Sequence, residues 1–159
     1  MSTPSPLLKY LICIGGTLAV GSLSGLATAS SIETWYVALE KPSFNPPNWI
    51  FGPVWTVLYI MMGTAAAMVW TNDHDPTSTD RPLLIYGLQL GLNALWSLVF
   101  FGMRSPVGAL VVIGLLIVAI IACIRLFRPV DVRAAWLLYP YLVWVGFATV
   151  LNASIAVLN

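Results

Sequence analysis

Five long stretches of this chain contain no Asp, Glu, Lys or Arg, and this feature limits the possible folds more than any other. A bilayer core about 30 Å thick needs roughly 20 apolar residues of helix to cross it, because each residue rises about 1.5 Å. Every stretch reaches that length, so each can hold one membrane-spanning helix. The neutral stretches cover residues 10–32, 42–72, 82–103, 105–124 and 134–159.

The scarcity of charge in the whole chain supports the same conclusion. Only 8% of the residues are charged, whereas roughly a quarter are charged in a soluble domain. Lipid offers the backbone no hydrogen-bond partners, so a spanning segment must be a helix or a strand of a closed barrel. Residues 111–124 lack the polar and apolar alternation of a barrel strand.

We therefore expect an all-α integral membrane protein that forms a five-transmembrane-helix bundle. Residues 1–159 are expected to form a single membrane domain. The expected helices cover about 7–29, 47–70, 82–102, 106–125 and 133–156.

The first neutral stretch has a second interpretation, as a cleaved signal peptide. Lys9 precedes an apolar run, and Ala27-Thr28-Ala29 is similar to a signal cleavage site. The apolar run is longer than a typical signal core, which favours a permanent first helix.

The distribution of basic residues predicts the orientation in the membrane. Cytoplasmic connections carry the excess of Lys and Arg in membrane proteins. The basic residues near the spans number five on the N-terminal side and two on the other side, so we expect a cytoplasmic N-terminus. The five are Lys9, Arg81, Arg125, Arg128 and Arg133, and the two are Lys41 and Arg104.

Several function classes are disfavoured by what the spans lack. No charged residue lies within the neutral stretches, so a charge relay of the kind found in ion pumps is not expected. The only histidine, His74, lies in the polar segment 71–81 beside Asp73 and Asp75. Adjacent side chains on such a segment do not converge on one ion, so we predict no metal site and no hydrolytic site.

The net charge of +1 gives no reason to expect a nucleic-acid partner.

Aromatic and amide side chains inside the spans recur at helical spacing. Trp55 and Tyr59 are four residues apart, and Asn93 and Trp96 are three apart. Trp144 and Ala148 repeat the spacing of four in the fifth span. If the three faces turn inward, they line an aromatic cavity suited to a flat, largely apolar ligand. The alternative is a solid core in which amide groups link the helices.

The connection expected over residues 30–46 is rich in stiff and amphipathic residues. Trp35 lies near its start, and Pro46-Pro47 is expected to rigidify its end and to start the second helix. Aromatic residues in such a connection are also typical of an interfacial belt. Pro140 is expected to loosen or bend the fifth helix beside Trp144.

Two glycine pairs have the GxxxG spacing that lets another helix approach closely. They are Gly21 with Gly25 and Gly87 with Gly91. Two interpretations are open. Both pairs can serve packing within the bundle, and Gly87 with Gly91 can also form a dimer interface.

Long motifs resemble those of one membrane-protein family. The chain is similar to the translocator protein family, also called TspO/MBR, tryptophan-rich sensory protein or peripheral-type benzodiazepine receptor. The resemblance covers nearly the whole chain. Its motifs are Trp35-Tyr36-x-x-Leu39-x-Lys41-Pro42-x-x-x-Pro46-Pro47, Phe51-Gly52-Pro53-Val54-Trp55-Thr56-x-Leu58-Tyr59, Gln89-Leu90-x-Leu92-Asn93-x-x-Trp96 and Trp136-Leu137-x-Tyr139-Pro140-Tyr141-x-x-Trp144.

The resemblance implies a five-helix bundle, often a homodimer, with a ligand pocket under the first long connection. It implies binding of porphyrins such as protoporphyrin IX, of sterols and of synthetic isoquinoline carboxamides or benzodiazepines, with no cofactor required. The family's pocket positions fall here on Trp35, Pro47, Trp55, Asn93, Trp96, Trp144 and Ala148, and the helical spacing adds Tyr59.

Three functions follow from the resemblance as alternatives. The first is a porphyrin-binding receptor linked to tetrapyrrole regulation or transport. The second is a light- and oxygen-dependent porphyrin-degrading enzyme in which Trp55 and Trp144 take part. The third is a carrier of porphyrin, lipid or sterol.

The C-terminal segment departs from the animal members of that family. Their fifth helix ends with an aromatic and a basic residue soon after the Leu-Asn pair, as part of a cholesterol-recognition pattern. After Leu151-Asn152 this chain has neither, which argues against sterol binding through that motif. The short neutral tail and compact connections favour a bacterial membrane over a mitochondrial outer membrane.

Overall fold

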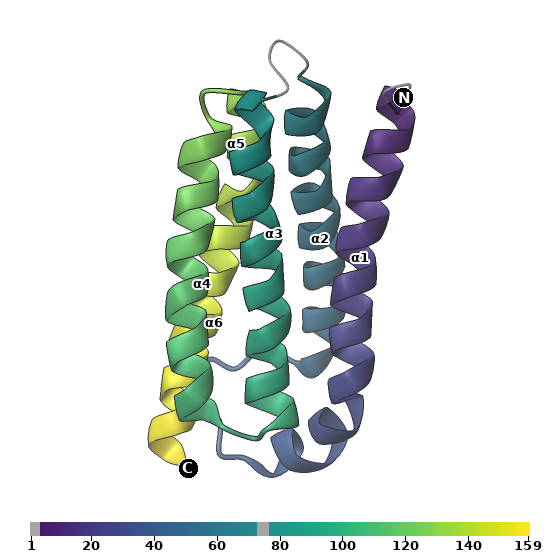
Figure 1. Ribbon diagram of the computed structural model, residues 1–159. Coiled ribbons are helices and arrows are strands. Elements are labelled where there is room, and N and C mark those ends of the chain that lie inside the picture. Colours follow the sequence, from purple (N-terminus) through teal and green to yellow (C-terminus); the bar gives the residue numbers. More distant parts are fainter. Residues whose placement is uncertain (1–3, 73–76) are drawn as a thin grey trace.

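The computed structural model describes residues 4–72 and 77–159, which form a bundle of long helices with no strand in these ranges (Figure 1). In chain order the elements are α1 (Pro6–Ser31), η1 (Ile32–Tyr36), α2 (Asn48–Thr71), α3 (Thr77–Ser97), η2 (Leu98–Gly102), α4 (Pro106–Phe127), α5 (Val132–Leu137) and α6 (Tyr139–Leu158). The short elements η1 and η2 are π-helical turns that continue α1 and α3.

Within the described residues, five helical segments are long and apolar enough to cross a membrane. The predicted five-helix membrane bundle is therefore confirmed. The first residues of α1 and the last of α6 lie at opposite ends of the bundle (Figure 1). The five segments are Pro6–Tyr36, Asn48–Thr71, Thr79–Gly102, Pro106–Phe127 and Val132–Leu158.

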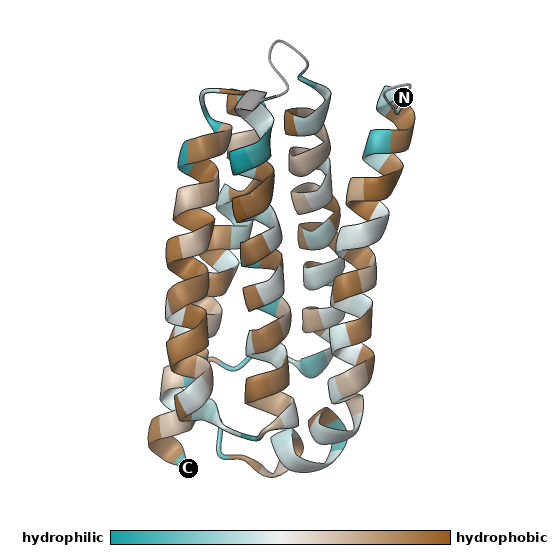
Figure 2. Cartoon of the chain, viewed as in Figure 1, coloured by the Kyte–Doolittle hydropathy of each residue, from teal (hydrophilic) through white to brown (hydrophobic). Residues whose placement is uncertain are grey.

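The outer surface of the bundle is apolar along most of its length. Large side chains such as Leu84, Val111 and Val143 are exposed. Hydrophobic residues cover the outward faces, and hydrophilic colours gather toward the two ends (Figure 2). In water such a surface would drive aggregation, whereas in a bilayer it faces acyl chains. The chain is thus an integral, multi-pass membrane protein.

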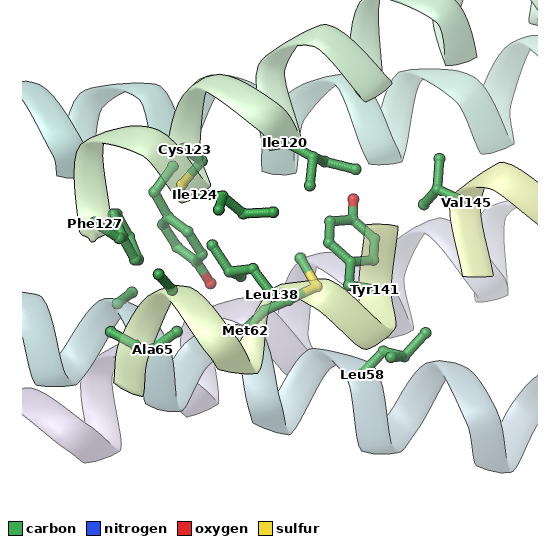
Figure 3. Close-up of a cluster of buried hydrophobic side chains, with 14 of the residues drawn as sticks. Leu58, Met62, Ala65, Ile120, Cys123, Ile124, Phe127, Leu138, Tyr141 and Val145 are labelled. Atoms are coloured by element: carbon green, nitrogen blue, oxygen red, sulfur yellow. The ribbon is translucent and has the colours of Figure 1, made fainter. Parts of the chain in front are cut away.

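One half of the bundle is solidly packed. Met62 of α2, Phe127 of α4 and Leu138 are almost completely buried and belong to one cluster (Figure 3). Small residues bring α1 and α2 together nearby, since a Cβ on Gly63 would lie 2.6 Å from the Ile14 Cα. This half of the bundle fixes the positions of the helices that surround the other half.

The first connection is shorter than the sequence predicts. Residues 30–46 were expected to be a loop, but the helix continues through η1 to Tyr36. No Gly or Pro occurs over residues 26–41, and Glu33 is exposed, so its charge does not oppose the extra helical turns. Trp35 therefore lies on the helical end of the first span, and the connection covers residues 37–47. Pro47 directly precedes α2, in agreement with its expected position at the helix start.

The fifth span is interrupted near Pro140. The helix breaks at Leu138, which separates α5 from α6. Pro140 has no backbone N–H and cannot donate to the preceding helical turn, so the loosening predicted for the fifth helix is confirmed, and the span as a whole covers Val132–Leu158.

Candidate ligand-binding cavity

A cavity of about 380 Å³ occupies the half of the bundle next to the 37–47 connection. Its walls come from α1, α2, the end of α3 with η2, and α6. The volume falls within the roughly 300–1,000 Å³ typical of small-molecule sites. The aromatic side chains in its lining are Tyr36, Phe51, Trp55, Tyr59, Trp96, Phe100, Phe101 and Trp144.

Most of the residues that the sequence singles out for a ligand site line this one cavity. They come from three different spans, as the helical spacing suggested. Those in the lining are Trp55, Tyr59, Asn93, Trp96, Trp144 and Ala148. Trp35 and Pro47 do not line it. The Trp35 ring packs edge-on against Phe100 with centroids 5.7 Å apart.

Aromatic rings contact one another along the walls of the cavity. Trp55 stacks on Tyr59 with centroids 5.5 Å apart and planes 27° apart. Trp96 lies 6.5 Å from Trp55, and across the cavity lining Trp144 meets Phe51 edge-on at 6.0 Å. Mutual packing holds these rings in place, so they offer a preformed apolar surface to a flat ligand.

The Asn93 amide links three helices at the inner end of the cavity. Tyr59 of α2 donates a hydrogen bond from its hydroxyl to Asn93 Oδ1 at 2.8 Å. Asn93 Nδ2 in turn donates to the Tyr141 hydroxyl oxygen of α6 at 3.1 Å. Buried amides need such partners. The amide linkage expected for a solid core therefore exists here together with the cavity.

The side-chain amide of Asn152 provides the hydrogen-bond acceptor for the Trp96 indole N–H. Trp96 Nε1 donates to Asn152 Oδ1 at 3.2 Å, and Asn152 Nδ2 donates to the Pro106 carbonyl at 2.8 Å. These bonds connect α3, α6 and the first turn of α4. They fix the plane of the Trp96 ring in the cavity wall.

Trp144 differs from the other tryptophans in the lining. Its Nε1 is buried, and no described residue accepts a hydrogen bond from it. The ring also borders a lipid-facing groove formed with Trp136, Tyr139 and Pro140. Trp144 thus separates the cavity from the outer surface of α6, and its indole N–H is a buried donor without an acceptor among the described residues.

The contribution of α1 to the cavity was not predicted from the sequence. Ser24 and Thr28 line the cavity, and their hydroxyls donate to carbonyls within α1, at Val20 and Ser24. The hydroxyls of these two residues are therefore satisfied within their own helix. Thr17, Ser24, Thr28 and Ser31 are all buried and recur at spacings of seven, four and three, a helical pattern that is visible in the sequence.

Gly21 was noted only for its GxxxG spacing, but it lies at a close contact. A Cβ on Gly21 would overlap the ring of Tyr59. The absence of a side chain at this position therefore allows Tyr59 to reach Asn93. Gly25, the other member of the pair, has open space where its Cβ would be.

Contacts with two spans hold the 37–47 connection over the end of the bundle. The Tyr36 hydroxyl donates to Asn45 Oδ1 at 3.0 Å. The Asn159 side chain bonds both backbone groups of Glu40, accepting from its N–H and donating to its carbonyl, each at 3.0 Å. Phe44 also packs edge-on against Phe147 of α6.

The remaining site predictions concern the outer face of α3 and the polar segment. Gly87 and Gly91 are exposed, with open space around their Cβ positions, so they do not pack against another helix of this chain. Their use in a dimer stays a prediction. His74 and its two neighbouring aspartates lie outside the described residues, and the described part of the chain contains no cluster of metal ligands.

Comparison with known proteins agrees with the motifs in the cavity walls. The model of the TspO/MBR family matches residues 13–158. The tryptophan-rich protein TspO of Archaeoglobus fulgidus is 41% identical over 154 residues, which cover 96% of this chain and 98% of the relative.

Two further relatives carry related names. The human translocator protein is 44% identical over 119 residues, covering 74% of this chain and 70% of the relative. The tryptophan-rich sensory protein of Cereibacter sphaeroides is 35% identical over 152 residues, covering 96% of this chain and 90% of the relative. The family match spans most of the chain, and this chain belongs to the TspO/MBR family.

Proposed function

We propose that this chain is a membrane receptor that binds a porphyrin-class ligand, such as protoporphyrin IX, in the aromatic cavity. One observation carries the proposal: Trp55, Trp96 and Trp144, from three different spans, line the same cavity. A planar macrocycle gains most from such walls, because it can lie against aromatic faces while leaving water.

The polar groups of the cavity suit a ligand that is apolar at its centre. The amides of Asn93 and Asn152 are engaged with neighbouring helices. The Trp144 N–H is buried and has no acceptor among the described residues, so it is a candidate donor to a carbonyl or carboxylate of the ligand. A porphyrin is somewhat larger than the cavity, so its carboxylate-bearing edge has to project through an opening.

Family membership supports a role as a sensor. One relative is named a tryptophan-rich sensory protein, and the human relative is named a translocator protein. The absence of charged residues from the neutral stretches disfavours ion-coupled transport. Ligand binding in a rigid aromatic site is therefore the function we assign to the cavity.

Quenching of tryptophan fluorescence by protoporphyrin IX tests this proposal in detergent or nanodiscs. Ala148→Leu should weaken binding at least about tenfold, or about 1.4 kcal/mol, because the larger side chain occupies part of the cavity. Trp144→Ala should weaken it similarly by removing a wall and a donor. Val150→Leu, on the exposed face of α6, is the matched control and should bind as the wild type does. Unchanged affinity in both cavity variants would refute the site.

A further inference from the structure

Besides Asn48 at the first position of α2, four residues on α1 and α2 both line the cavity and are exposed on the protein. They are Ser22 and Gly25 on α1, and Gly52 and Thr56 on α2. The other walls contain half-buried or buried side chains, such as Trp96 on α3 and Ala148 on α6. The wall between α1 and α2 is therefore the one that opens to the outside.

Glycines show how the spacing between α1 and α2 changes along the bundle. At Gly63 a Cβ would lie 2.6 Å from the Ile14 Cα, so the two backbones touch. At Gly52 and Gly25 a Cβ would meet no heavy atom within 4 Å. Gly52, Thr56 and Gly63 share one face of α2 by their spacing of four and seven. Helices α1 and α2 are therefore in contact at the level of Gly63 and apart at the level of Gly52.

The opening between α1 and α2 is chemically suited to apolar passage. The Thr56 hydroxyl donates to the Gly52 carbonyl at 2.9 Å and is therefore satisfied within its own helix. None of the four bordering residues is charged. Gly52 and Thr56 lie four and eight residues after the start of α2, or roughly 6 and 12 Å along the helix. The opening is therefore at the outer part of the hydrocarbon layer, close to the headgroups.

The aqueous end of the bundle is closed more firmly. The 37–47 connection is held by the bonds of Asn159 to Glu40 and of Tyr36 to Asn45. The Lys41 ammonium also donates to the Val37 and Leu39 carbonyls at 3.2 and 3.0 Å. The Lys41 bonds lie within the connection, so a ligand that arrived from water at this end would have to displace the contacts made by Asn159 and Tyr36.

We infer that the ligand reaches the cavity sideways from the bilayer, through the α1–α2 opening bordered by Ser22, Gly25, Gly52 and Thr56. The inference rests on the proposed function and narrows its ligand class to amphiphiles that dissolve in the membrane. Such a molecule keeps its carboxylates at the headgroup level while its ring system slides between the helices. The same opening accommodates the edge of a porphyrin that the cavity cannot enclose.

Binding kinetics in nanodiscs test the route. Gly25→Leu should slow association of bilayer-dissolved protoporphyrin IX at least about tenfold, because the side chain fills the opening. Gly15→Leu is the matched control, since Gly15 is exposed on the same helix but does not line the cavity. Asn159→Ala, which releases the 37–47 connection, should leave the rate unchanged. An unchanged rate in Gly25→Leu together with a faster rate in Asn159→Ala would overturn the inference.

A second readout needs no porphyrin. Ala148→Cys, in a background where Cys13 and Cys123 are alanine, places a thiol on the cavity wall. A lipid-soluble maleimide added to proteoliposomes should label that thiol, and Gly25→Leu should slow the labelling at least about tenfold. Equal labelling with and without Gly25→Leu would contradict lateral access. If labelling behaves as expected but porphyrin does not bind, the proposed porphyrin ligand is wrong, whereas lateral access through the α1–α2 opening is still supported.

Discussion

Gly21 of α1 lies directly against the ring of Tyr59 of α2, with no room for a Cβ atom between them. This contact places the Tyr59 hydroxyl 2.8 Å from Asn93 Oδ1 and the Tyr59 ring against Trp55. A residue without a side chain thus determines where two parts of the cavity wall meet.

Gly21→Ala should therefore damage the cavity more than its small size suggests. The added methyl group displaces the Tyr59 ring, so the hydrogen bond to Asn93 and the stacking on Trp55 are both disturbed. We expect porphyrin affinity to fall about tenfold, or about 1.4 kcal/mol, in a fluorescence titration. Gly15→Ala, at an exposed position of α1 that does not line the cavity, should bind normally. Equal behaviour of the two variants would mean that the Tyr59 contact is unimportant.

Tyr141→Phe should destabilise the bundle. Removal of the hydroxyl leaves Asn93 Nδ2 buried without its acceptor, which costs about 1–3 kcal/mol. Thermal unfolding in detergent measures the effect. Tyr139→Phe, at an exposed position two residues earlier, should unfold at the wild-type temperature. A wild-type melting temperature for Tyr141→Phe would show that the amide has no dependence on this hydroxyl.

Gln89→Leu should stabilise the protein, although it removes a buried polar group. Both polar atoms of the Gln89 side chain are buried and have no partner among the described residues. A leucine of similar volume removes a desolvation cost of about 1–3 kcal/mol. The melting temperature in detergent should rise. A lower melting temperature would indicate that the amide binds a partner such as an internal water molecule.

Illumination of the protoporphyrin complex distinguishes a receptor from a photo-oxidative enzyme. Under the receptor proposal, light on the protoporphyrin complex in air should bleach the ligand without forming a discrete product, and Trp55→Phe should change nothing. Trp55 stacks on Tyr59 and lies 6.5 Å from Trp96, so oxidation there is a specific alternative. Absorption spectra that show a new product in the wild type, absent in Trp55→Phe, would favour the enzyme.

The sequence predicted the fold well because lipid limits the possibilities. A spanning segment has to be a helix or a strand of a closed barrel, the barrel pattern is missing here, and the five neutral stretches correspond to the five spans. The prediction ended the first helix at about residue 29, within the neutral stretch 10–32. The structure continues to Tyr36, because the Tyr36 ring packs against Phe101 and no helix-breaking residue intervenes.

Prediction of the cavity depended on which residues carry a chemical signal. Trp55, Asn93 and Trp144 stand out because tryptophan and amides are conspicuous within an apolar span. Gly21 has no side chain and Thr28 has a small one, and their position on a wall follows only from how α1 packs against α2. Trp35 and Pro47 were predicted as pocket residues from the family resemblance, but neither lines the cavity. A resemblance gives the position of a residue along the chain and not the direction in which its side chain points.

A structure of the protein with protoporphyrin IX bound in a membrane mimetic would show directly whether the cavity is the porphyrin site. We expect the macrocycle inside the cavity, in contact with Trp55, Trp96 and Trp144, with its carboxylate edge toward the gap between α1 and α2. A porphyrin bound instead in the outer groove beside Trp136 and Tyr139, with the cavity unchanged, would contradict this expectation.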